Sequence, residues 1–185
     1  MTPPLKYAKI ALSGGFPPRE GTKLIYFICT LIGIAAVVLD QFTKALTLQN
    51  LSLGEIFPVW QGLFHFTHLR NEGMSFSMFE GGRWVFVAVT FAVIAFCILA
   101  MYKKWIDHPF GLISLSCVLG GAVGNLIDRI RWGYVVDMIE VEFMRFAVFN
   151  VADIFIVCGG IAFCIFGVFF WQEPEKKEKN HETDG

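Results

Sequence analysis

Four long segments without a charged side chain constrain this sequence more than any other feature. They contain 16, 19, 19 and 18 residues and are Leu24–Leu39, Trp84–Tyr102, Pro109–Ile127 and Ile154–Trp171. An α-helix needs about 20 apolar residues to cross a bilayer core about 30 Å thick. The first segment reaches that length if its helix continues through Asp40 toward Lys44. The sequence therefore predicts an α-helical integral membrane protein with four transmembrane helices.

The composition excludes several other classes of protein. Only 17% of the residues are charged, against about 25% in an average globular protein. A net charge of −1 provides no basic field for a phosphate backbone, so no nucleic-acid partner is expected. The five cysteines lie inside the apolar segments without a CxxC pair, and we interpret them as small hydrophobic residues; they are Cys29, Cys97, Cys117, Cys158 and Cys164.

The chain divides into a membrane domain, residues 24–172, and two polar tails, residues 1–23 and 173–185, for which disorder is expected. A cleaved signal peptide is the alternative for the first apolar segment, but no small-x-small cleavage motif follows it. Nine Lys and Arg residues lie in the tails and in the connection between the second and third segments, against six on the other side. This bias predicts that both termini are cytoplasmic.

The two connections on the outer side carry β-strand patterns. Leu63–Leu69 is rich in strand-forming residues and precedes the turn-forming sequence Asn-Glu-Gly at 71–73. In Val135–Phe143 the odd-numbered residues are apolar apart from Asp137, which indicates a half-buried strand. Arg145–Phe149 is the expected return strand. We therefore predict a small β-sheet on the outer face of the membrane.

Two aspartates stand out in this pattern. Asp137 lies on the apolar face of its strand, where burial should raise its pKa. Asp153 opens the fourth apolar segment, where it can complete a capping box with Asn150 and interact favourably with the helix dipole. A structural and a catalytic role for Asp153 are compatible. Two carboxyl groups in environments that separate their pKa values suit general acid–base catalysis.

Further polar residues cluster at the same side of the membrane. Asp40 and Lys44 are four residues apart on one helix, and Asn125 and Asp128 are three apart, followed by Arg129. A structural hydrogen-bond network at the helix ends is the simplest interpretation of these five residues, although ionisable groups at membrane depth are also candidates for function.

Other catalytic chemistries lack their signatures. The sequence contains no HExxH motif, no GxSxG motif and no Walker A loop. His65 and His68 fall on opposite faces of a strand without evident co-ligands, so no metal site is expected.

Five short runs, in order along the chain, resemble those of the lipoprotein signal peptidases, also called signal peptidase II. They are LDQFTK at 39–44, NEGMSFS at 71–77, GGAVGNLIDR at 120–129, GYVVD at 133–137 and FNVAD at 149–153. Each run is weak alone, but the set in this order is specific and spans nearly all of the chain except the tails.

This resemblance implies a multi-pass aspartic peptidase of the bacterial inner membrane, with its site at the outer face and no metal or other cofactor. The family cuts diacylglyceryl-modified prolipoproteins just before the lipidated cysteine. Its fold combines four transmembrane helices, a small extracytoplasmic β-sheet cradle and a short helix over the site. The catalytic pair would be Asp137 and Asp153, and a monomer in contact with membrane lipids is expected. The residues implied to support the site or bind substrate are Asp40, Lys44, Asn71, Gly73, Asn125, Asp128, Arg129, Asn150 and Ala152.

The sequence departs from the family in two places. Met74 and Ser75 stand where the family usually has two small residues, which puts the shape of the substrate pocket in doubt. Asp137 and Asp153 are 16 residues apart, slightly closer than is usual, so the intervening loop is expected to be short.

Three other functions remain alternatives. A proton-coupled transporter would have charges within its spans, whereas the charges here lie at one membrane edge. A membrane anchor for electron transfer would need axial histidines within its helices, and the apolar segments contain none. A catalytically inactive lipid-binding relative would be expected to lack the aspartate pair.

Overall fold

Four long helices and a three-stranded sheet make up the computed structural model, which describes residues 20–73 and 83–170. The helices are α2 (Glu20–Asn50), α3 (Arg83–Tyr102), α4 (Pro109–Arg131) and α5 (Val151–Phe169). Each is long and apolar enough to cross a membrane. The strands are β1 (Ile56–Trp60), β2 (Phe64–Asn71) and β3 (Val135–Val141). The predicted fold class is thus confirmed.

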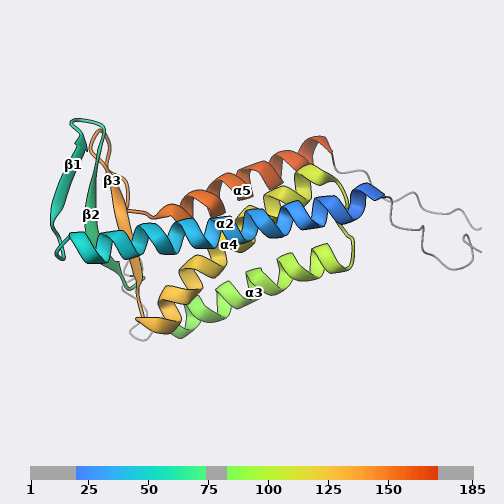
Figure 1. Cartoon of the computed structure of the whole chain (residues 1–185), viewed down its shortest axis with the longest axis horizontal. Helices are drawn as coiled ribbons and strands as arrows, with labels where there is room; N and C mark the ends of the chain where they lie inside the picture. The colour runs from blue at the N-terminus through green and yellow to red at the C-terminus, as the bar shows by residue number, and fades with distance from the viewer. Residues whose placement is uncertain (1–19, 74–82, 171–185) are drawn as a thin grey trace, which may run out of the picture.

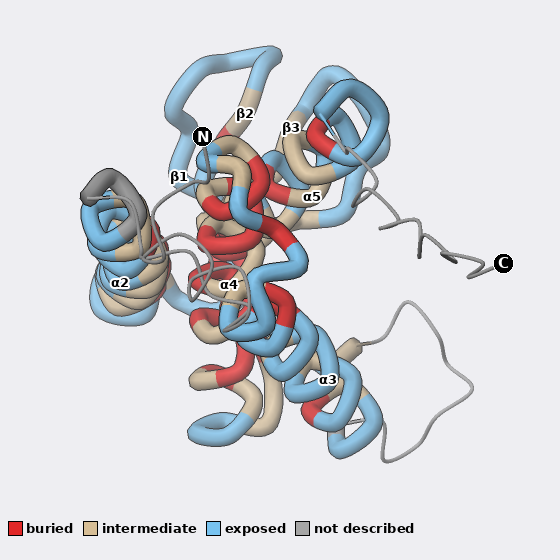
Figure 2. The backbone as a smooth tube through the Cα atoms, turned by 90° about the vertical axis from the view of Figure 1, so that its right-hand side faces the viewer, coloured by how far each residue is buried: buried red, intermediate tan, exposed pale blue. Residues whose placement is uncertain are grey.

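The helices run side by side, and the sheet lies at one end of them with its strands crossing the helix axes (Figure 1). Both described ends of the chain and the connection between α3 and α4 lie at the opposite end (Figure 1). Helix α4 occupies the centre and is the most buried (Figure 2), with contacts to α2, α3 and α5. Helix α3 packs against α4, and the Tyr26 hydroxyl of α2 also donates a hydrogen bond to the Met101 carbonyl oxygen of α3 at 3.3 Å. Most of the surface of α2, α3 and α5 is therefore left to face lipid.

The helix ends follow local sequence signals. Helix α4 begins at Pro109, where a missing N–H costs nothing, and the His108 side chain accepts a hydrogen bond from the Phe110 N–H. Helix α5 begins after Asn150, which forms the predicted capping box with Asp153. Helix α2 continues through Asp40 and Lys44 as expected, and extends further, to Asn50.

The sheet is antiparallel in the order β1-β2-β3, and β2 and β3 agree with the predicted strands. The pairing of β2 with β3 changes register between Phe66 and Leu69, where β2 accommodates an extra residue in a β-bulge. This bulge lies directly beside Asp137, which pairs with Leu69.

Two details of the predicted sheet are wrong. Arg145–Phe149 forms no strand: only Phe149 pairs with β3, through one isolated bridge to Ile139. The chain bends at residues 142–144 directly after β3, and residues 145–148 form no ladder with that strand. Strand β1 was not predicted. Its Pro58 lacks a backbone N–H and is tolerated because β1 lies at the sheet edge.

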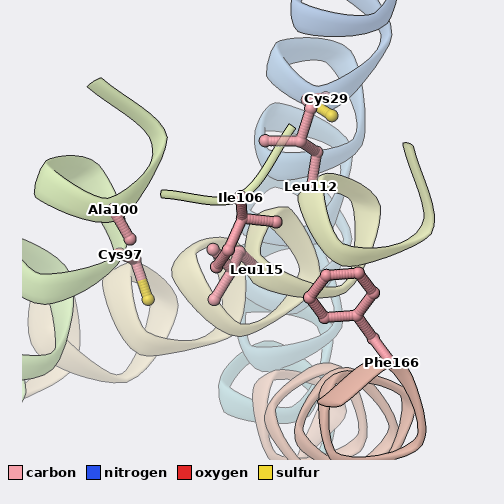
Figure 3. Packing of buried hydrophobic residues seen from close by; sticks show 7 residues of the cluster. All are labelled: Cys29, Cys97, Ala100, Ile106, Leu112, Leu115 and Phe166. Carbon is pink, nitrogen blue, oxygen red and sulfur yellow. The ribbon is translucent and has the colours of Figure 1, made fainter. Parts of the chain in front are cut away.

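The apolar core lies at the end of the bundle away from the sheet. Cys29 of α2, Leu112 and Leu115 of α4 and Phe166 of α5 converge there, and Figure 3 shows them with Ile106 and two residues of α3. Cys29 is 2% exposed and packs as a small hydrophobic residue, as predicted. All five cysteines are free thiols.

Some expectations concern segments outside the described residues. Residues 1–19 and 173–185 of the tails, together with Met74 and Ser75, lie there, so their predicted properties stay predictions. Residues 20–23, which were assigned to the N-terminal tail, instead form the start of α2. Residues 20–73 and 83–170 contain no short helix beyond the four long ones.

Candidate active site

A buried ion cluster joins α2 to α4 near the sheet. The Lys44 ammonium lies 2.8 Å from Asp40 Oδ2 and 2.9 Å from Asp128 Oδ2, and its side chain is 3% exposed. Gly124 of α4 lets Asp40 approach closely, because any Cβ there would collide with the Asp40 carboxylate. The second oxygen of Asp40 accepts a hydrogen bond from the Ala152 backbone N–H at 2.9 Å, which ties α2 to the start of α5.

Gln41 completes this cluster and was not among the predicted site residues. Its side-chain amide donates to Asp128 Oδ1 at 2.9 Å, and Asp40 Oδ2 and the Gly124 carbonyl oxygen lie at 3.2 Å. The signal was present in the sequence, because Gln41 lies three residues before Lys44 on one helix face.

Asp137 lies at the inner end of β3 and is fully buried. Its Oδ1 accepts a hydrogen bond from the Asn150 side-chain amide at 2.6 Å, and its Oδ2 accepts one from the Asn71 amide at 2.8 Å. Burial raises the pKa of Asp137 to about 6, opposed by these two hydrogen bonds and reinforced by the negative charge of Asp153. Asp137 therefore gains or loses its proton near neutral pH.

Asp153 occupies the first turn of α5 and is partly exposed. Its Oδ1 accepts a hydrogen bond from the Asn125 side-chain amide at 2.8 Å, and its Oδ2 accepts one from the Asn150 backbone N–H at 3.2 Å. A helix N-terminus stabilises a negative charge at this position. The capping role and a chemical role can therefore coexist in one carboxylate.

Two asparagine side chains connect the ion cluster with both aspartates. Asn125 Oδ1 accepts hydrogen bonds from Lys44 Nζ at 3.0 Å and from the Asn150 amide at 3.2 Å. Its own amide then points to Asp153, while the Asn150 amide also reaches Asp137. Because an ammonium group only donates, Lys44 fixes the orientation of Asn125 and, through it, that of Asn150.

The remaining predicted residues border this network. Gly73 donates its backbone N–H to Asn71 Oδ1 at 2.9 Å, and its φ of 84° together with close contact to the Phe86 ring requires glycine. Arg129 donates to the Asn125 carbonyl oxygen, lies over the Phe86 ring at 5.5 Å and interacts electrostatically with both aspartates.

Comparison with known proteins shows which family this chain belongs to. The family model described as Signal peptidase (SPase) II matches residues 32–170. The chain belongs to the signal peptidase II family. The lipoprotein signal peptidase of Enterococcus faecalis is 44% identical over 164 residues, covering 87% of this chain and 97% of that protein. That of Brevibacillus brevis is 40% identical over 129 residues, covering 70% and 87%.

Solved structures agree with the family assignment. A bacterial membrane enzyme determined at 1.9 Å resolution superimposes with a TM-score of 0.73 and 27% identity, covering 78% of this chain and 94% of that one. A second, at 2.3 Å, gives a TM-score of 0.72 and 28% identity, covering 81% and 94%.

Membership of the signal peptidase II family makes the chain a membrane peptidase of the kind that removes signal peptides from prolipoproteins. All eleven residues that the resemblance implied for the site lie within the matched region, and the structure joins them in one hydrogen-bonded network. Two carboxyl groups on different elements, each with both oxygens held by N–H donors, are suited to handling one proton between them.

Proposed function

We propose that this chain is an aspartic endopeptidase that cuts diacylglyceryl-modified prolipoproteins just before the lipidated cysteine. The observation that carries this proposal is the placement of Asp137 and Asp153 in one amide network at the sheet end of four membrane helices. Family membership supplies the signal-peptide substrate. The catalytic type rests on the two carboxyl groups.

The environments of the two aspartates support different roles for them in this proposal. Asp137 is fully buried and has a pKa of about 6, so it is the proton-holding partner. Asp153 is partly exposed at a helix N-terminus and is the ionised partner.

The reaction follows from this assignment. Asp153 takes a proton from a water molecule, whose oxygen attacks the scissile carbonyl carbon, while Asp137 gives its proton to the carbonyl oxygen. When the tetrahedral intermediate collapses, the C–N bond breaks, the proton on Asp153 passes to the leaving amine of the cysteine, and Asp137 takes back a proton from one hydroxyl of the intermediate as the carbonyl re-forms. General acid–base catalysis contributes about 10²–10⁴-fold, and positioning by the amide network contributes further.

An apolar cavity beside the site suits the lipid portion of the substrate. It has a volume of about 620 Å³, within the range typical of ligand sites. Met138 and Ile139, which follow Asp137 directly, line it together with Leu46 of α2 and Phe66 of β2. We place an acyl chain of the diacylglyceryl group here, so a Leu46→Trp variant should raise KM for lipidated substrate.

We place the protein in the bacterial inner membrane as a monomer, with both termini cytoplasmic and the sheet outside. The charge bias of the sequence supports this orientation. A fluorescent protein fused to the C-terminus tests it, because a fusion that fluoresces only when cytoplasmic should be bright. A fully translated fusion that does not fluoresce would show that the C-terminus lies outside the cytoplasm and would contradict this orientation.

A cleavage assay tests the proposed reaction. The purified protein in detergent is incubated with a prolipoprotein that either carries or lacks the diacylglyceryl group. Mass spectrometry then identifies the products and the bond that was cut. We expect the lipidated substrate alone to yield a product beginning at the modified cysteine. Equal cleavage of both substrates, or cleavage at another bond, would refute the proposed specificity.

A further inference from the structure

A histidine on the sheet is clamped between two glutamates outside the aspartate network. His65 of β2 is 8% exposed, with its Nε2 3.0 Å from Glu140 Oε2 and its Nδ1 3.0 Å from Glu142 Oε1. Glu140 lies on β3 and Glu142 follows the end of that strand directly, and His65 pairs with Glu140 across the sheet. The other oxygen of Glu142 accepts a hydrogen bond from the Gly62 backbone N–H at 2.7 Å.

Only the imidazolium form of His65 satisfies both contacts, because ionised carboxylates accept but do not donate hydrogen bonds. The bond to Glu142, followed by that to Glu140, raises the pKa of His65 above 6.5, against the lowering effect of burial. The same bond and the Gly62 N–H lower the pKa of Glu142. Strand β1 presents no titratable group, and Arg145 is the other charged residue lining the cavity beside the cluster.

This clamp lies across the β-bulge from the catalytic pair. The bulge falls between Phe66 and Leu69 of β2, with His65 on one side of it and Asn71 on the other. Ladder pairing is interrupted at a bulge, so flanking contacts have to fix the register of the two strands. Since Asn71 holds Asp137 Oδ2, any slip of β2 along β3 moves that amide away from the carboxyl group.

We propose that His65 is a positioning residue, whose imidazolium clamps Glu140 and Glu142 and so holds β2 in the register that aims Asn71 at Asp137. This inference rests on the proposed catalytic role of Asp137. Because the clamp requires the protonated ring and ionised glutamates, it is intact below the pKa of His65 as long as both carboxylates are ionised, and it is lost as the pH rises through the pKa of His65. The enzyme then loses turnover at alkaline pH beyond the loss caused by ionisation of Asp137.

Two variants separate the charge from the contacts. His65→Gln removes the positive charge and replaces the two ring nitrogens, which bind different carboxylates, by one amide nitrogen, so we expect kcat to fall about tenfold at pH 6.5, with KM within about twofold. Glu140→Gln/Glu142→Gln replaces the carboxylates by amides that can bond either form of the ring. We expect this double variant to keep kcat within about twofold at pH 6.5, and to gain about tenfold relative to the wild type between pH 7 and 9. His68→Gln, which removes another buried histidine of the same strand, should follow the wild-type pH profile.

Histidine NMR on the full chain in detergent gives a second measurement that does not depend on activity. The His65 ring should titrate above pH 6.5 in the wild type, and at or below 6.5 in Glu140→Gln/Glu142→Gln. A His65 that titrates below 6.5 in the wild type would overturn the inference, as would a parallel pH profile of all variants. If Asp137→Asn is as active as the wild type, the proposed function itself fails. If Asp137→Asn is inactive and His65→Gln behaves as the wild type, only the positioning role fails.

Discussion

Replacing Lys44 by methionine should destabilise the protein more than any surface substitution. The change keeps most of the apolar length of the side chain but removes the ammonium group that lies within 3 Å of Asp40 and Asp128. Both carboxylates are essentially buried, at 0% and 2% exposure, and Gln41 alone would then bridge them. Removing one member of such a cluster leaves an uncompensated buried charge, which costs about 3–5 kcal/mol.

Thermal unfolding in detergent micelles measures this loss. For a chain of this size we expect the midpoint of the Lys44→Met variant to fall by about 6–20 °C. Lys103→Met, an exposed lysine at the opposite end of the bundle, is the matched control and should change stability by less than about 0.5 kcal/mol. The double variant Lys44→Met/Asp128→Asn removes one carboxylate charge together with the lysine, so it should recover more than half of the loss.

A loss below about 1 kcal/mol for Lys44→Met would refute this reasoning. It would mean that water reaches the cluster or that the two carboxylates share a proton without cost. Failure of the double variant to recover would show that the lysine acts through packing rather than through charge.

Three further predictions concern the aspartate network. Gly73→Ala should cost about 1–2 kcal/mol in thermal unfolding and lower kcat, because its φ of 84° and the Phe86 ring leave no room for a Cβ and its N–H holds Asn71. The pKa of Asp137 is about 6 in the folded state, against 3.8 for an aspartate in the unfolded chain. Between these two pH values the folded state binds more protons than the unfolded state, so the stability falls as the pH rises through this window. This contribution is about 3 kcal/mol, and the difference in unfolding free energy between wild type and Asp137→Asn, measured from pH 4 to 7, should show it; equal slopes would contradict it. Asn150→Asp keeps the capping oxygen but loses the amide donor to Asp137, so circular dichroism should show an intact α5 while cleavage slows about 10²-fold.

Local sequence patterns predicted the parts of this fold that depend on local physics. Four charge-free segments indicated four helices because the bilayer requires length and apolarity, and Asn150 with Asp153 indicated a helix start because capping is local. The same rules failed where tertiary position decides. Strand β1 was not predicted, and it accommodates Pro58 because it lies at the edge of the sheet.

The candidate site shows a different limit. The alternation of apolar and polar residues along β3 indicated a buried position for Asp137, and helical spacing paired Asp40 with Lys44. The structure confirms both the burial and the ion pair. No local pattern brings Asp40 to the Ala152 N–H, 112 residues away, or Asn71 to Asp137. The resemblance to a family supplied those groupings, whereas the clamp around His65 emerged only from the pairing register of the sheet.

Turnover of the two aspartate variants tests the central claim most directly. Single-turnover cleavage of a diacylglyceryl prolipoprotein is measured for the wild type, Asp137→Asn, Asp153→Asn and the exposed control Asp107→Asn at the opposite end of the bundle. We predict that each site variant loses at least about 10²–10⁴-fold in rate while remaining folded, and that Asp107→Asn matches the wild type. A folded Asp137→Asn or Asp153→Asn that cleaves at the wild-type rate would contradict the aspartic mechanism.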